Sequence, residues 1–116
     1  MNTQNYYRIV SVFEDVWNFT AEFEIKSDLK FTPTLLNSML LESAELIYKN
    51  GIFETQLNLS YYSHYVSDDI KINSNIILEA DILKQTNNNL IAECYLYDKL
   101  SNQFLAKAFF VYASQI

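Results

Sequence analysis

The sequence predicts an α+β domain in which one long helix lies between segments that read as β-strands. Residues 32–51 are the only stretch that reads as a long helix with both of its ends marked. Residues 17–25 alternate between apolar and polar side chains, and strand-like segments make up the chain after the helix. With 116 residues, half of them apolar, we expect residues 1–116 to form one domain with its own core.

The N-terminal region leaves two alternatives open. Apolar side chains recur at helical spacing at Tyr6, Ile9, Val10, Phe13 and Trp17, but residues 7–13 also read as a strand, so periodicity does not decide between them. The next segment is clearer, because Trp17, Phe19, Ala21, Phe23 and Ile25 alternate with polar residues. This period of two predicts a half-buried strand over residues 17–25.

The predicted helix has a signal at each end. Thr32 is a capping residue, and Pro33 fits the first helical position, where no backbone N–H is needed. Asn50 and Gly51, which follow Lys49 in the last turn, can adopt the left-handed backbone conformation that ends a helix; we refer to this as the left-handed stop. These signals place the helix at residues 33–50.

The apolar arc of this helix covers about two-thirds of its circumference, so we expect it to be buried almost all round. The arc consists of Leu35, Leu36, Met39, Leu40, Leu41, Ala44, Leu46, Ile47 and Tyr48. The remaining polar strip holds Ser38, Glu42, Glu45 and Lys49. Glu42 lies at the edge of that strip, beside Leu35 and Leu46.

Four strands are predicted after the helix, at residues 55–67, 76–85, 90–98 and 104–113, with the even spacing of a meander. Polar clusters separate them. Asn87, Asn88 and Asn89 mark the clearest turn, because asparagine tolerates the left-handed conformation of tight hairpins. Residues 99–103 form a second turn. The alternation is lost over residues 68–75, which predicts a crossover or an irregular edge.

Composition excludes several classes of function. A net charge of −6 without a cluster of Lys or Arg argues against nucleic-acid binding, and no apolar run is long enough to span a membrane. The single cysteine, Cys94, reads as a small core residue, and the first thirty residues show no secretory signal, so we expect a reduced, cytoplasmic protein. Adjacent carboxylates such as Asp68 and Asp69 are too few for a metal site, and we expect no metal or cofactor.

The order of strand, long apolar helix and four strands resembles the hotdog fold, in which an antiparallel sheet curls around one central helix. The stretch ILEADILKQTNNNLIAECYLYDKLSNQFLAKAFFVYAS, residues 77–114, resembles the last three strands of phenylacetate-type acyl-CoA thioesterases and of hydroxyacyl-carrier-protein dehydratases. Residues 40–44, LLESA, resemble the acidic helix motif of both families and place Glu42 at the catalytic position. Beside a thioester carbonyl, such a carboxylate acts as a general base or a nucleophile.

Two departures from these families bear on the chemistry. The thioesterases present His-Gly-Gly at the start of the helix, where this chain has Pro33, Thr34 and Leu35. A backbone N–H of Thr34 or Leu35 remains a candidate donor to the thioester oxygen, because the first N–H groups of a helix have no partner within it. The dehydratases need a histidine before the helix, and the only histidine here is His64, on a later strand. Thioester hydrolysis is therefore favoured over dehydration.

The resemblance implies an acyl-thioester hydrolase of fatty acid metabolism, acting on acyl-CoA or acyl carrier protein thioesters as a homodimer or a dimer of dimers. The alternative is a non-catalytic hotdog domain that binds an acyl-CoA or acyl chain as a sensor or scaffold. A third class, a cone-shaped α+β ligand binder, requires helices before the sheet. The candidate catalytic residue is Glu42, and the candidate substrate-binding residues are Thr34, Leu35, Asn37, Ser38, Leu46, Ser60 and His64. Asn37 lies within the apolar arc, so it should hydrogen-bond a buried group.

Overall fold

A computed structural model describes residues 7–14, 17–25, 33–68, 70, 72 and 74–114. Its elements, in chain order, are β1 (Tyr7–Glu14), β2 (Asn18–Ile25), α1 (Pro33–Asn50), β3 (Asn58–Val66), β4 (Ile76–Gln85), β5 (Asn89–Asp98) and β6 (Phe104–Ala113). The helix is confirmed at residues 33–50, and the predicted strands are confirmed with small shifts at their ends. The undecided N-terminal segment is a strand. Thr32, the predicted cap, lies outside the described residues.

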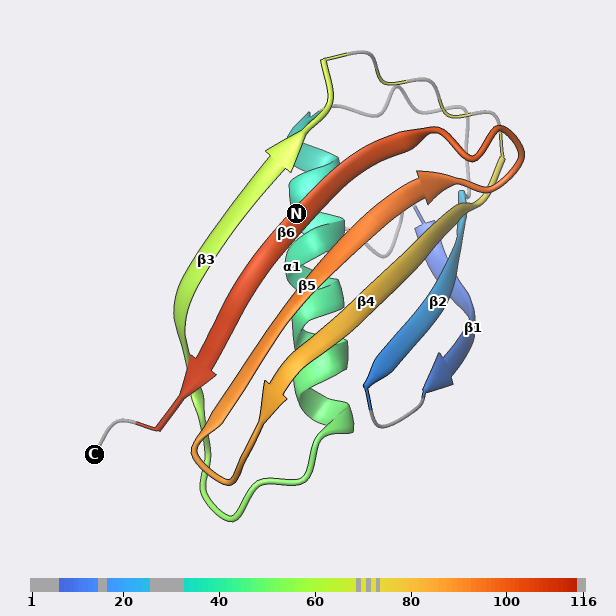
Figure 1. Cartoon of the computed structure of the whole chain (residues 1–116). Coiled ribbons are helices and arrows are strands. Elements are labelled where there is room, and N and C mark those ends of the chain that lie inside the picture. Colours follow the sequence, from blue (N-terminus) through green and yellow to red (C-terminus); the bar gives the residue numbers. More distant parts are fainter. Residues whose placement is uncertain are drawn as a thin grey trace.

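The strands form a single antiparallel sheet in the order β1-β2-β4-β5-β6-β3 (Figure 1). β4, β5 and β6 are a meander, as their spacing predicted. β3 pairs with β6 rather than with β4, so the chain between β3 and β4 must pass over two strands. The irregular stretch before β4 is therefore a crossover, and β1 and β3 are the two edges of the sheet.

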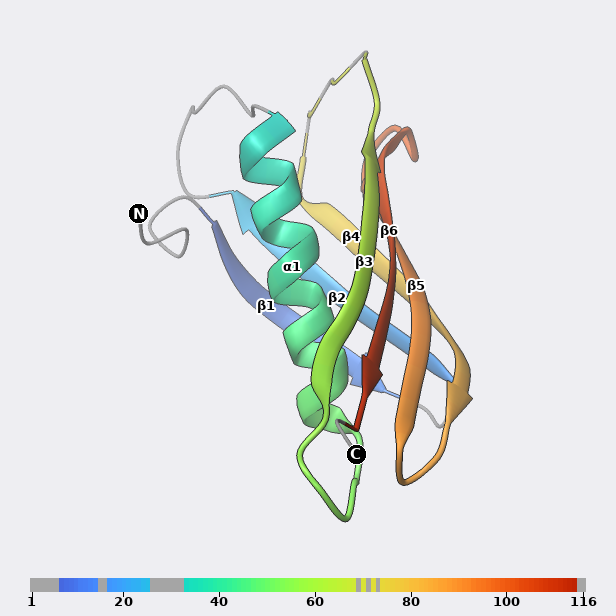
Figure 2. The same cartoon turned by 90° about the vertical axis from the view of Figure 1, so that its left-hand side faces the viewer.

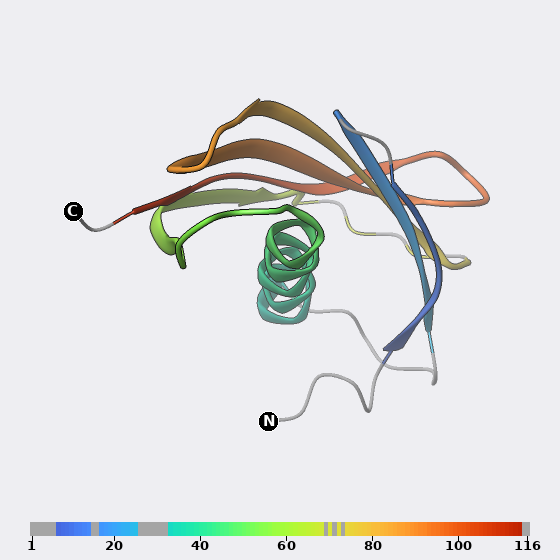
Figure 3. The same cartoon turned by 90° about the horizontal axis from the view of Figure 1, so that it is seen from below.

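The helix lies against the concave face of this sheet (Figure 2). Viewed along the helix, β1 and β2 turn toward it on one side, and β3 covers it on the other (Figure 3). The fully covered side of α1 consists of Leu36, Met39, Leu40, Ser43, Ala44 and Ile47. The opposite sheet residues, including Phe23, Leu78, Leu96 and Phe110, are equally buried and complete the core.

The prediction of a helix buried almost all round was wrong for the single chain. Leu41 is 38% exposed, and Leu35, Leu46 and Tyr48 are only partly buried. Conversely, Ser43 is fully buried because its hydroxyl donates to the carbonyl of Met39 at 2.6 Å, which satisfies the polar group inside the helix. The sheet covers one side of α1 and leaves part of the apolar arc accessible.

The left-handed stop predicted at the end of the helix was also wrong. Gly51 does not have a positive φ. Its N–H donates to the carbonyl of Tyr48 at 3.0 Å, and a Cβ at this position would lie 2.5 Å from the ring of Phe53. Any larger residue here would require the ring of Phe53, which packs directly against the backbone, to move.

The turn between β4 and β5 likewise forms without left-handed asparagines. Thr86 Oγ1 accepts hydrogen bonds from the backbone N–H groups of Asn88 and Asn89, at 3.2 and 3.1 Å, and thereby replaces the predicted backbone conformation. Among the described non-glycine residues, the positive φ belongs to Asn102, at 60° in the predicted second turn. Asparagine does take the left-handed conformation in this protein, but in the β5–β6 hairpin.

Candidate functional site

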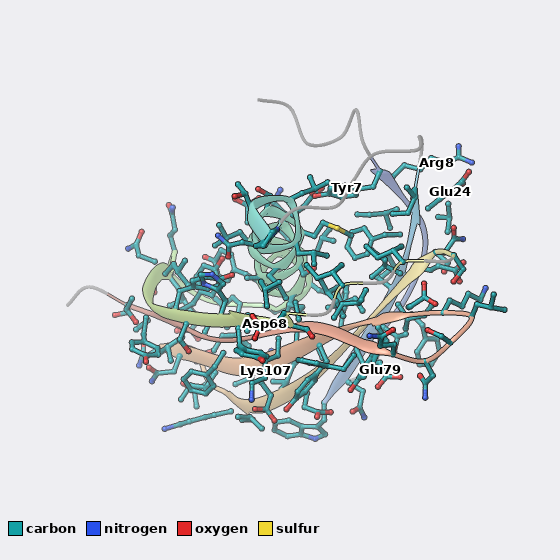
Figure 4. The ribbon with its side chains drawn as sticks, turned by 90° about the horizontal axis from the view of Figure 1, so that it is seen from above. Tyr7, Arg8, Glu24, Asp68, Glu79 and Lys107 are labelled. Carbon is teal, nitrogen blue, oxygen red and sulfur yellow. The ribbon has the colours of Figure 1, made fainter. Side chains whose placement is uncertain are left out.

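The carboxylate of Glu42 is fixed from the β1 edge of the sheet. Glu42 is half-buried in the middle of α1, and the hydroxyl of Tyr7 donates a hydrogen bond to its Oε2. Tyr7 is 1% exposed, and its ring meets that of Phe23 edge-on, with centroids 5.3 Å apart and planes at 82°. Tyr7 lies on the helix side of the sheet, whereas Glu79 and Lys107 project from the opposite face (Figure 4). A rigid, buried aromatic residue thus holds one carboxylate oxygen.

The apolar residues predicted beside Glu42 share its side of the helix. Leu35 and Leu46 stand seven residues before and four residues after Glu42, and both are partly buried against the core. Glu45, on the same polar strip, is exposed. Glu42 is therefore the carboxylate of α1 that combines an apolar setting with a buried hydrogen-bond donor.

Asn37 is fixed from the other edge of the sheet. The hydroxyl of Tyr62, on β3, donates to Asn37 Oδ1 at 2.8 Å, so the partner of Asn37 within the chain is a partly buried hydroxyl where a buried group was predicted. Burial raises the pKa of Tyr62 well above its usual range, so this hydroxyl stays protonated. The ring of His64 stacks near that of Tyr62, with centroids 5.6 Å apart. Ser60, also on β3, donates to the carbonyl of Val111 at 3.2 Å.

Six of the eight candidate residues consequently divide into two groups. Asn37 and Glu42 are five positions apart, which separates them by about 140° around the helix axis. Asn37 bonds to β3 and Glu42 to β1, and these strands are opposite edges of the sheet. Within one chain the structure brings Glu42 together with Leu35 and Leu46 but not with Asn37, Ser60 or His64.

The start of α1 carries the remaining candidates. Thr34 is exposed in the first turn, and its carbonyl accepts the hydroxyl of Ser38 at 3.1 Å. The Ser38 hydroxyl is therefore engaged with the helix backbone. Pro33 has no N–H, so the next backbone donor at the positive end of the helix is that of Thr34.

Solved structures of other proteins share this architecture. Zebrafish thioesterase superfamily member 2 superposes with a TM-score of 0.73 at 11% identity, over 96% of this chain and 83% of that chain. A Streptococcus mutans protein bound to acetyl CoA gives 0.70 at 14% identity, over 92% and 86% of the two chains. A hypothetical thioesterase protein of Streptococcus pneumoniae with coenzyme A gives 0.69 at 9% identity, over 95% and 87%. The chain has the hotdog fold.

Sequence comparison adds nothing to this likeness. No family model matches the chain, and no curated protein matches it. At identities this low, the superpositions establish the shared hotdog fold alone. The chemistry has to be argued from the residues. In the part of the chain that the structure describes, no group of three or more His, Cys, Asp or Glu residues is arranged to hold a metal ion. None of its helices is long and apolar enough to cross a membrane.

Sequence reasoning missed Tyr7 as a residue of the Glu42 site. Tyr7 lies in the segment for which the sequence allowed either a helix or a strand, and its partner Glu42 lies 35 positions further along the chain. The available signal was the strand alternative itself, because a strand starting at Tyr7 directs alternate side chains of an edge strand toward the helix. Pairing Tyr7 with Glu42 additionally requires the curvature of the hotdog sheet.

Proposed function

We propose that this chain hydrolyses an acyl thioester of coenzyme A or acyl carrier protein. The observation that carries the proposal is Glu42, a half-buried carboxylate held by Tyr7 on the central helix of a hotdog fold. The fold is shared with zebrafish thioesterase superfamily member 2 and with a Streptococcus mutans protein bound to acetyl CoA, which supports the substrate class. With such a substrate, the proposed role is in fatty acid metabolism in the cytoplasm.

In the proposed reaction, Glu42 removes a proton from water as the water oxygen attacks the thioester carbonyl carbon. The C–S bond then breaks, and the proton returns to the departing sulfur, which yields a carboxylic acid and a free thiol. Attack by Glu42 itself, followed by hydrolysis of the anhydride, gives the same products. The N–H of Thr34, at the positive end of α1, lies eight residues before Glu42, about 12 Å along the helix axis, so it can donate to that carbonyl oxygen only from a second copy of the chain. Leu35 and Leu46 contact the acyl chain of the substrate in this proposal.

A second candidate function is non-catalytic binding of an acyl-CoA or acyl chain. It is favoured by the separation of Glu42 from Asn37 on opposite sides of α1, and by the side chains of Thr34 and Leu35 at the start of the helix. Side chains at these positions restrict the close approach of a thioester to the backbone. In this function, Leu35 and Leu46 hold the ligand and no thiol is released.

We also propose that the chain forms a homodimer through β3, alone or as a dimer of two such dimers. β3 is an edge strand, and unpaired edges with exposed apolar side chains are normally covered. Tyr61 is 55% exposed and Tyr65 50% exposed on this strand. Pairing of β3 with β3 of a second copy continues the sheet and satisfies the free backbone groups of both edges.

The test is a thiol-release assay over a range of acyl-CoA chain lengths. Glu42→Gln preserves size and removes the base, so turnover should fall by about 100-fold or more, with little change in fold or in acyl-CoA binding. Glu45→Gln, on the same strip but exposed, is the matched control and should be nearly silent. Hydrolysis by the parent that survives Glu42→Gln would refute the mechanism. Saturable acyl-CoA binding without hydrolysis of any substrate would establish the binding function instead.

A further inference from the structure

We infer that Tyr7 is the positioning residue for Glu42, so that the N-terminal strand is part of the active site. The inference rests on the proposed function, because it concerns how the proposed base is held. Its starting observation is the hydrogen bond from the Tyr7 hydroxyl to Glu42 Oε2, which joins β1 to the middle of α1.

A free glutamate side chain has three rotatable bonds and samples several rotamers, whereas a catalytic base must stay in one geometry. Tyr7 has the properties needed to impose that geometry. Its ring is 1% exposed and rests edge-on against Phe23, so the hydroxyl is fixed relative to the sheet. A hydroxyl that donates to a carboxylate forms a charge-assisted bond, which is stronger and shorter than a neutral one.

The bond also distinguishes the two carboxylate oxygens. Oε2 accepts the hydroxyl of Tyr7, while Oε1 accepts no hydrogen bond from any residue that the structure describes. Oε2 is therefore the held oxygen, and Oε1 is the oxygen available to take a proton from water. This assignment needs no contribution from Asn37, Ser60 or His64, which lie toward the β3 edge.

The test compares two tyrosines that each use a hydroxyl to anchor α1. Tyr7→Phe keeps the ring against Phe23 and removes only the donor to Glu42. Tyr48→Phe is the matched control, because the Tyr48 hydroxyl accepts the N–H of Leu57 at 2.9 Å and has no contact with the carboxylate. We expect Tyr7→Phe to lower kcat about 10-fold to 100-fold with KM unchanged, and Tyr48→Phe to leave both constants unchanged.

Two further variants separate positioning from general support of the fold. In the Glu42→Gln background, Tyr7→Phe should cause no additional loss, because the group on which it acts is gone. Glu42→Asp withdraws the carboxylate by one methylene from the hydroxyl and should reproduce the loss of kcat caused by Tyr7→Phe.

The outcomes are distinct. Parent turnover that drops with Glu42→Gln but stays within about twofold in Tyr7→Phe overturns the role of Tyr7 and leaves the proposed function intact. Equal losses from Tyr7→Phe in the parent and Glu42→Gln backgrounds reduce Tyr7 to a structural residue. Absence of thiol release by the parent refutes the proposed function and this role of Tyr7 together.

Discussion

A buried carboxylate at the end of β5 offers a sharp test of what stabilises the fold. Asp98 is fully buried, and its side chain connects the β5–β6 hairpin to the segment before β4. Oδ2 accepts the N–H and the hydroxyl of Ser101, at 3.0 and 2.7 Å, and Oδ1 accepts the N–H of Ser74 at 3.1 Å. The Ser74 hydroxyl lies 3.3 Å from Oδ1 but is also 3.2 Å from the carbonyl of Asn75, so one proton serves both.

Asp98→Asn replaces one acceptor oxygen by an NH₂ group with almost no change in volume. In its better orientation, with the NH₂ group toward Ser74, the amide loses the bond from the Ser74 N–H and the shared bond from the Ser74 hydroxyl, and the bonds from Ser101 lose their charge assistance. A hydrogen bond to a charged group contributes about 1.5–3 kcal/mol, and removal of the buried charge offsets part of the loss. We therefore expect the free energy of unfolding to fall by about 2 kcal/mol, which lowers Tm by roughly 8 °C in a domain of this size.

Urea denaturation of the parent and Asp98→Asn measures this change directly, since an unchanged m-value shows that only stability has altered. Asp81→Asn is the control, because Asp81 is exposed on β4 and its loss should stay within about 0.5 kcal/mol. If Asp98→Asn were as stable as Asp81→Asn, the hydrogen bonds to Asp98 would not be what holds the hairpin to β4.

Four further predictions follow from burial, accessibility and topology. Leu40 is fully buried, so Leu40→Ala should cost about 2–5 kcal/mol in a denaturant melt, whereas Glu45→Ala should be tolerated; the reverse order would contradict the orientation of α1. Burial raises the pKa of the Cys94 thiol to about 12, so a thiol reagent at pH 8 should label the folded protein slowly and the urea-unfolded protein at once, and equal rates would exclude a buried thiol. Light scattering should give about two or four times the 13.6 kDa mass of the chain, and a monomeric parent at micromolar concentration would contradict the homodimer. Successive residues of a strand direct their N–H groups to opposite sides, so of Ser63 and His64 one N–H faces β6 and the other faces the free edge of β3. Proline at the residue whose N–H faces the free edge should therefore give a folded monomer. If Ser63→Pro and His64→Pro are both dimeric, β3 is not the interface.

The helix and the strands after residue 17 were predictable from the sequence because they have a clear period and clear ends, whereas periodicity left helix and strand open for β1. Pro33 and Gly51 delimit the helix, and alternation from Trp17 onward defines β2. The local backbone conformations were not predictable, since they depend on side chains that arrive from elsewhere or act in an unexpected way. The ring of Phe53 explains Gly51, and the hydroxyl of Thr86 shapes the turn for which three asparagines had suggested left-handed residues.

The candidate site was predictable only in part for a related reason. Glu42 stands out within one helix, where three- and four-residue spacing shows its apolar neighbours directly. Tyr7 and Tyr62, which fix Glu42 and Asn37, lie on β1 and β3, far from these residues in the sequence. Contacts of this kind depend on which strands become the edges of the sheet, and the order β1-β2-β4-β5-β6-β3 is not evident from the spacing of the segments.

The two tyrosines also define what a second copy of the chain can contribute. A copy that pairs along β3 lies beside Asn37, Tyr62 and His64, whereas Glu42 is turned toward β1 at the other edge. Loss of the dimer should then change the surroundings of Asn37 before those of Glu42. If Glu42 and Tyr7 alone carry the hydrolytic step, a folded monomeric β3 variant retains kcat on short acyl chains. If the variant loses kcat in parallel with its dimer, the Asn37 side belongs to the same active site, and residues of both copies complete it.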